Sequence, residues 1–305
     1  MASLQLALCG FTFLLVCIAA GLCFMAVLQL FHLGFYALFL VVSIVGVVLT
    51  VLFLSALAIS RSTPVPKWRP NRSPIHLLVV LGSGGHTAEM FSLLRRMKLD
   101  PAKYTYRTYI ISSGDNFSAT KAVEYESTLL EHGAESESYV IVTVPRARRV
   151  HQSYLTAPFT TLLSFWSCLL TLCGLHPDQK QQKLPAELPT SYPDLILTNG
   201  PATAVCVILA ARLLRLCHYC LSFLFPARMR AHPLAATVDG NDPLAVEFRL
   251  RTIFVESWAR VKTLSLSGKI LLPFADRFLV QWPALDGKRA WWGPRKAQYI
   301  GGLMD

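Results

Sequence analysis

The chain has 305 residues, of which 53% are hydrophobic and 15% are Asp, Glu, Lys or Arg. An ordinary soluble domain contains roughly 25% charged residues. Residues 1–60 contain none, and Arg61 is the first. This distribution excludes a disordered chain, a fibrous chain and a plain soluble protein. It leaves a membrane-anchored protein with one soluble domain of ordinary size.

The net charge of +11 lies entirely in the soluble part. A basic surface suits nucleic acid, an anionic membrane or phosphorylated substrates. The sequence shows no zinc-finger spacing, basic zipper or RNA-recognition signature, so we expect no nucleic-acid partner. The eight cysteines form no disulfide framework, which favours a domain facing the cytosol. Cys217 and Cys220 have C-x-x-C spacing but no second pair at zinc-site distance, so we predict no metal site.

The first 60 residues predict a transmembrane anchor. The apolar stretch from Leu4 to Ile59 has one soft interruption, at residues 29–34. Because about 20 residues span a bilayer, each flank is long enough to cross it. We therefore predict two spans, at about 6–28 and 35–58, with a single long anchor as the alternative. A cleaved signal peptide is disfavoured, since no positive n-region is present.

Residues 61–74 form a basic, proline-rich stalk. Its basic residues are Arg61, Lys67, Arg69 and Arg72. By the positive-inside rule this end of the anchor is cytoplasmic. The two Asn-x-Ser sequons, at Asn71 and Asn116, are therefore expected to stay unmodified.

Residues 75–285 predict an α/β domain. Strands are predicted at 75–81, 106–112, 139–144, 194–198, 251–255 and 277–281, and helices at 86–97, 116–132, 150–175, 201–216 and 261–272. Apolar strands that alternate with helices are typical of a parallel doubly wound sheet. Ligands of such sheets bind at the carboxyl ends of the strands. Polar or glycine-rich turns follow five strands, at 82–87, 112–116, 145–149, 199–201 and 256–257, and predict the site there.

The first of these turns reads Gly-Ser-Gly-Gly-His-Thr over residues 82–87. A glycine loop that leads into a helix is suited to bind phosphate, because the helix amides favour negative charge. It does not match a dinucleotide fingerprint, since Thr87 stands at the last glycine. It matches neither a P-loop nor a serine-hydrolase elbow. A tight turn that only packs the helix against the strand remains the alternative.

Five segments resemble successive motifs of one family: LVVLGSGGHTAEM (78–90), PRARRVHQS (145–153), PDLILTNGP (193–201), FVESWARVKTLSLSGKIL (254–271) and ADRFLVQWPAL (275–285). This is the membrane-anchoring subunit of the two-chain N-acetylglucosaminyltransferase that adds the second sugar to dolichyl diphosphate. The family resembles the N-terminal, acceptor-binding half of a GT-B glycosyltransferase. The resemblance implies one Rossmann-like domain, no cofactor, and no metal.

The resemblance also implies partners and a location. A cytosolic catalytic subunit would bind the donor UDP-N-acetylglucosamine (UDP-GlcNAc), and this chain the acceptor dolichyl diphosphate N-acetylglucosamine. The pair would work on the cytosolic face of the endoplasmic reticulum (ER) membrane. A pure membrane scaffold and a self-sufficient glycosyltransferase are the alternatives. The second is disfavoured, because about 245 residues supply one Rossmann-like domain and not two.

Under this resemblance, several residues acquire predicted binding roles. Those expected to cradle the acceptor diphosphate are Gly82, Ser83, Gly84, Gly85 and Thr87. Arg146, Arg148 and Arg149 follow a strand and would pair with the diphosphate or with lipid headgroups. Their alternative is a solvated basic loop. Asn199 and Gly200 would shape the floor of the pocket, and Ser257 would bind substrate. Asp115 and Asn116 are weaker candidates.

Two residues are predicted to be catalytic. A neutral imidazole at His86 would take the proton from the attacking sugar hydroxyl. Hydrogen bonding to the substrate and a structural role are the alternatives. Glu256 is the second candidate for the base, with helix capping as its alternative.

The chain departs from the family pattern in two places. An insert of roughly thirty residues at about 217–250 is either a lineage-specific loop or an error in the gene structure. The tail 286–305 carries Trp291 and Trp292, and we predict that it helps to dock the catalytic subunit. Trp282, just before the tail, suits partner binding and core packing equally well.

Overall fold

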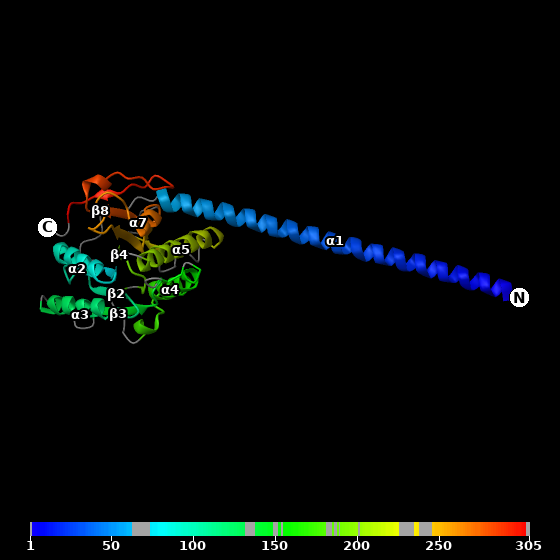
Figure 1. The fold of residues 1–305 in the computed structure, drawn as a ribbon, viewed down its shortest axis with the longest axis horizontal. Coiled ribbons are helices and arrows are strands. Elements are labelled where there is room, and N and C mark those ends of the chain that lie inside the picture. The colour runs from blue at the N-terminus through cyan, green and yellow to red at the C-terminus, as the bar shows by residue number, and fades with distance from the viewer. Residues whose placement is uncertain are drawn as a thin grey trace. The chain divides into compact units, whose positions relative to one another are not determined.

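The structure is a computed structural model that forms two units, residues 1–59 and 60–305 (Figure 1). It describes residues 2–62, 74–131, 138–148, 152–153, 155–180, 185, 188, 190–200, 202–225, 235–237 and 246–302. Apart from residues 61, 62 and 74, the predicted stalk lies outside the described residues, and so does the sequon at Asn71.

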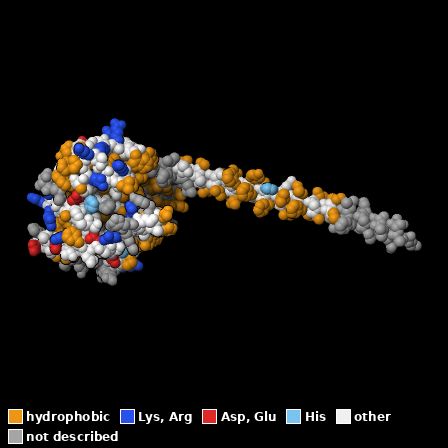
Figure 2. Space-filling view, viewed as in Figure 1, with side chains coloured by type: hydrophobic (Ala, Val, Ile, Leu, Met, Phe, Trp, Pro, Cys, Tyr) orange, Lys and Arg blue, Asp and Glu red, His pale blue; other side chains and the backbone are white. Residues whose placement is uncertain are grey.

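The first unit consists of helix α1 (Ala2–Ser62), whose last residues belong to the second unit and which has no turn at residues 29–34. The structure therefore has one continuous helix where we predicted two, and the number of membrane spans stays a prediction. The physical reason is that this interruption contains no proline and one glycine, Gly34, which costs a helix only about 1 kcal/mol. Within α1 the segment Cys17–Val48 is long and apolar enough to cross a bilayer, and Figure 2 shows hydrophobic side chains along it.

The second unit is built on a seven-stranded sheet, as the sequence predicts. The strands are β1 (His76–Val80), β2 (Tyr106–Ser112), β3 (Tyr139–Val144), β4 (Leu195–Asn199), β7 (Arg251–Val255), β8 (Arg277–Val280) and β9 (Gln298–Tyr299). Their order is β3-β2-β1-β4-β7-β8-β9, and all the pairs are parallel. This is the Rossmann order, whose switch point lies between β1 and β4. The predicted fold class is confirmed.

Helices cover both faces of the sheet (Figure 1). The main ones are α2 (Gly85–Met97), α3 (Asn116–Glu131), α4 (Ala157–Leu172) and α5 (Thr203–Leu224). Apolar side chains of α2 and α3 pack on one face, and those of α4 and α5 on the other. A third cluster joins α5 to β7, β8 and the short helix α7 (Leu266–Leu271). Two 3-10 turns, η1 (Pro177–Gln179) and η2 (Pro283–Leu285), complete these elements.

Three elements differ from the sequence prediction. Helix α4 begins at Ala157 and not at residue 150, because Pro158 fits only the first turn of a helix. Helix α7 begins at Leu266 because Ser265 caps it, its hydroxyl accepting a hydrogen bond from the Gly268 amide at 2.9 Å. Strand β9 is unpredicted, since two residues are too short to show a periodic pattern.

The predicted insert contains regular structure. Helix α5 continues to Leu224, past Cys217 and Cys220, so residues 217–224 extend a helix of the domain. Two short strands, β5 (Ala235–Thr237) and β6 (Val246–Phe248), form an antiparallel pair. The remaining residues between Phe225 and Val246 lie outside the described part of the chain.

Burial of His76 predicts that the domain loses stability in mild acid. Its side chain is 1% exposed, and burial lowers its pKa from 6.5 to about 4. Between these two values the unfolded chain binds more protons than the folded chain, so stability falls as the pH falls. From about pH 7.5 to about pH 5, we expect a loss of about 2 kcal/mol from this group. Urea unfolding of the chain and of His76→Gln checks this: the variant should lack that part of the loss, and equal losses would contradict it.

Candidate active site

The five polar turns lie together at one edge of the sheet. Because the strands are parallel, their carboxyl ends all meet there. The turn after β1 adjoins the turn after β4, and the turn after β7 follows. The turns after these strands therefore share one edge of the sheet, as the sequence predicts, and the function of that edge stays a prediction.

The glycine loop after β1 presents an open front. Gly84 has φ 62°, and α2 begins at Gly85 without a side-chain cap. Ser83, Gly84 and Gly85 are exposed. In the part of the chain that the structure describes, no atom beyond the adjoining backbone lies within 4 Å of where a Cβ on Gly84 or Gly85 would stand. Free space before a helix N-terminus is suited to an anion.

Thr87 lies behind the loop and is fully buried. Its hydroxyl donates to the carbonyl of Gly82 and lies 2.6 Å from the Ser118 hydroxyl. Ser118 in turn donates to the carboxylate of Asp115 at 2.7 Å. Thr87 and Asp115 therefore support the loop from inside the domain, while Asn116 lies exposed at the start of α3.

The ring of His86 lies between two glycines. A Cβ on Gly82 would stand 2.7 Å from the His86 Cβ, and one on Gly200 would stand 3.0 Å from the ring atom Cγ. Gly200 also has φ 83°, a conformation that other residues rarely adopt. Both positions therefore require glycine, and the side chain of His86 stays 32% exposed.

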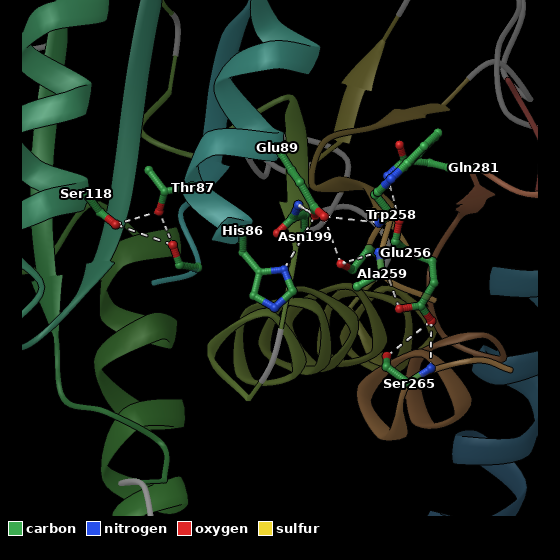
Figure 3. Close-up of polar contacts among 12 residues, drawn as sticks. His86, Thr87, Glu89, Ser118, Asn199, Glu256, Trp258, Ala259, Ser265 and Gln281 are labelled. Atoms are coloured by element: carbon green, nitrogen blue, oxygen red, sulfur yellow. Dashed lines mark hydrogen bonds and ion pairs between the residues drawn. The ribbon is translucent and has the colours of Figure 1, made fainter. Parts of the chain in front are cut away.

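The carboxylate of Glu89, one turn along α2 from His86, joins three elements of the site (Figure 3). It accepts hydrogen bonds from Asn199 Nδ2 at 2.9 Å, Ser257 Oγ at 2.9 Å and the Trp258 amide at 3.1 Å. Its Oε2 also lies 3.5 Å from His86 Nδ1. Burial raises the pKa of Glu89, but the interactions with His86 and Ser257 outweigh it and hold the pKa below its usual value.

Glu89 is a site residue that we did not predict from the sequence. Its signal is the spacing His-x-x-Glu directly after the glycine loop, because residues three apart share one face of a helix. The structure brings His86, Asn199, Gly200 and Ser257 together around it.

Glu256 lies at the end of β7 with its carboxylate directed toward Ser265 (Figure 3). That carboxylate accepts hydrogen bonds from the Ser265 amide at 3.0 Å and hydroxyl at 3.1 Å. The residue is 1% exposed, and burial raises its pKa. Its carbonyl accepts from Gln281 Nε2 at 2.9 Å. These contacts favour the capping alternative, in which Glu256 holds the loop before α7.

Comparison of this sequence with known proteins identifies its family. A family described as "Oligosaccharide biosynthesis protein Alg14 like" matches residues 77–303 of the chain. The chain belongs to the Alg14 family. It is similar to "UDP-N-acetylglucosamine transferase subunit alg14" of Aspergillus fumigatus, 58% identical over 71% of this chain and 100% of that protein. The subunits of that name from Schizosaccharomyces pombe and Homo sapiens are 40% and 32% identical, over 74% and 85% of this chain and 82% and 95% of their own lengths. No solved structure matches.

In this Alg14 family member, the structure describes two of the three predicted basic residues, Arg146 and Arg148. Arg146 donates to the carbonyls of Ser113 at 2.9 Å and Gly114 at 3.5 Å, so it braces the turn after β2. Arg148 is exposed and donates to the Gln152 carbonyl at 3.3 Å. Arg149 lies outside the described residues. All three arginines follow β3, which is two strands away from β1 in the sheet. At ordinary strand spacing, β3 and β1 are about 10 Å apart.

Proposed function

We propose that this chain is the membrane-anchored, acceptor-binding subunit of the transferase that adds the second N-acetylglucosamine to dolichyl diphosphate N-acetylglucosamine. Membership of the Alg14 family makes it a subunit of a UDP-N-acetylglucosamine transferase in oligosaccharide biosynthesis. The proposal adds which substrate it binds and which residues take part in the transfer.

One observation carries the acceptor site: an open glycine loop at a helix N-terminus lies beside a partly exposed histidine. The exposed backbone from Ser83 to Gly85 supplies amide groups that favour an anion, as a diphosphate requires. His86 belongs to the same turn, so its ring lies next to whatever this backbone binds. Arg146 and Arg148, two strands away, add positive charge on this edge of the sheet.

In the transfer, a hydroxyl oxygen of the acceptor sugar bonds to the anomeric carbon of the donor sugar. The bond from that carbon to UDP breaks, and UDP leaves with the electron pair. The hydroxyl proton passes to His86 Nε2, which acts as general base. Gly82 and Gly200 keep the ring in place through close backbone contact.

A partner chain would hold most of the donor. The described part of the domain is one Rossmann-like sheet with a small antiparallel strand pair, and a GT-B enzyme needs two such domains. A cytosolic catalytic subunit would supply the second and bind UDP-N-acetylglucosamine. Trp291 and Trp292 in the tail are 71% and 38% exposed and stack on each other, which suits a docking surface for that subunit. Trp282 instead packs on Trp258, at 4.5 Å between ring centroids.

A dolichol-linked acceptor requires a membrane location, which we place on the cytosolic face of the ER. The support is the apolar helix α1, which carries the first basic residue of the chain, Arg61, at its C-terminal end. Helix α4 adds exposed apolar side chains, among them Phe159, Leu162 and Trp166, on the domain itself. Exposed apolar groups on one helix are typical of a surface that meets a membrane or a protein.

Transfer of N-acetylglucosamine in membranes tests the proposal. UDP-N-acetylglucosamine and a dolichyl-type diphosphate N-acetylglucosamine are supplied to membranes with this chain alone, with the catalytic chain alone, and with both. We expect activity only with both. Full activity without this chain would reduce it to a scaffold at most, and activity of this chain alone would mean that it holds a donor site of its own.

A further inference from the structure

We propose that Glu89 is the positioning residue of this site, orienting His86 so that Nε2 is free to accept the proton of the acceptor hydroxyl. The inference rests on the proposed function, because it assigns a role to Glu89 only through His86. It rests on three observations of the site: an unsatisfied ring nitrogen, a bridging carboxylate and a ring held by backbone.

The first observation is that His86 Nδ1 is buried and makes no hydrogen bond to any residue that the structure describes. The carboxylate atom Glu89 Oε2 lies 3.5 Å from it. Figure 3 shows Nδ1 on the edge of the ring that faces Glu89 and Nε2 on the edge directed away from it. A carboxylate beside Nδ1 favours the tautomer that carries its hydrogen there, which leaves the lone pair on Nε2.

The second observation is that Glu89 is itself held from two other strands. Asn199 follows β4 in the sheet, and Ser257 and Trp258 follow β7, and all three donate to this carboxylate. The carboxylate is thus fixed independently of His86, and its side chain is only 12% exposed. A fixed anion also stabilises the imidazolium that forms when Nε2 takes a proton.

The third observation is that the ring has little freedom to turn. The backbone at Gly82 and Gly200 approaches it closely enough to exclude a Cβ at either position. The separation of 3.5 Å is longer than a hydrogen bond, and contacts of catalytic groups are often long until substrate binds. We therefore expect the contact between Nδ1 and Oε2 to shorten in the complex with acceptor.

Glu89→Gln is the variant that isolates this role. It keeps the size of the side chain and one accepting oxygen for Ser257 and Trp258, but it removes the negative charge beside His86. Asn199 can adapt by turning its amide, because its buried Oδ1 has no hydrogen-bond partner in the described part of the chain and would accept from the new Gln amide. The matched control is Glu124→Gln on α3, an exposed carboxylate paired with Lys121.

The experiment is a double-mutant cycle in membranes that contain both chains, with rates expressed per assembled pair. We expect E89Q to lower kcat about 10-fold or more, while KM for the acceptor changes less than about 2-fold. In the His86→Ala background, E89Q should cost less than about 2-fold, because its target is already gone. E124Q should match the unmodified pair.

Each other result has a distinct meaning. An equal loss from E89Q in both backgrounds would overturn the inference, since Glu89 would then act without His86, and so would full activity of E89Q. No loss from His86→Ala alone would overturn the proposed function and the inference with it. If E89Q prevents assembly, Glu89→Asp serves in the same cycle: it keeps the charge at shorter reach, so we expect a smaller loss that likewise disappears in the His86→Ala background.

Discussion

Replacing His86 with alanine is expected to lower the rate of sugar transfer by the assembled pair about 100-fold or more. General acid or base groups typically contribute factors of that size. The imidazole lies in the first turn of α2, next to the open glycine loop, and about a third of its side chain is exposed. Its removal opens space between Gly82 and Gly200, and the buried His86 Nδ1 makes no hydrogen bond within the described part of the chain, so folding should be little affected. The measurement is the initial rate per assembled pair, with co-purification of the catalytic chain as the check on assembly.

The variant His86→Gln separates the two chemical roles that the sequence leaves open. Glutamine keeps a polar group near the position of Nε2 but does not accept a proton at neutral pH. If His86 is the base, H86Q should be as slow as His86→Ala. If the ring only hydrogen bonds to the acceptor, H86Q should recover much of the rate, and the assignment of the base would be wrong. Normal activity of both variants would leave this chain as a scaffold.

The sequence predicts most of the sheet because its strands are apolar runs bounded by turn residues. Strand β2 (Tyr106–Ser112) and strand β3 (Tyr139–Val144) match their predicted ranges, and both carry the β-branched and aromatic residues typical of strands. Prediction fails where periodicity carries no information. The apolar region before Ile59 has only one soft interruption, at residues 29–34, which does not distinguish a turn from a continuous helix, and the structure forms α1 without a turn there.

The site is predicted less completely than the fold. The glycine loop and His86 can be recognised from the sequence. Glycines directly before a helix allow a tight turn and leave the helix amides open to an anion. The direction of a carboxylate depends on tertiary contacts that sequence does not show. Glu256 and Glu89 both lie near the carboxyl edge of the sheet, yet the first is directed at Ser265 and the second approaches His86. The sequence therefore led us to predict Glu256 as the catalytic acidic residue, although Glu89 is the one that approaches His86.

A buried cluster of charged residues around Asp276 lies at the start of β8, at the opposite end of that strand from the site. We expect it to stabilise the domain. Asp276 is 5% exposed and accepts from Arg212 at 2.6 Å and from Arg215 at 2.7 Å. Arg295 lies 3.6 Å away, and the Thr252 amide donates at 3.0 Å. Burial raises the pKa of Asp276, but the arginines outweigh it and hold the pKa well below its usual value. Burial likewise lowers the pKa of Arg212 to about 9.

Replacing Asp276 with asparagine is therefore expected to destabilise the domain by about 3–5 kcal/mol, because buried arginines lose their counter-charge. For a domain of this size that loss lowers the melting temperature by about 10 °C. Thermal unfolding of the full chain in detergent measures it, with Asp100→Asn, an exposed acid that caps a turn, as the matched control. Asp276 precedes β8 and the site follows the carboxyl ends, so transfer per assembled pair should stay unchanged below the melting transition. An unchanged melting temperature would show that the three arginines do not need this carboxylate.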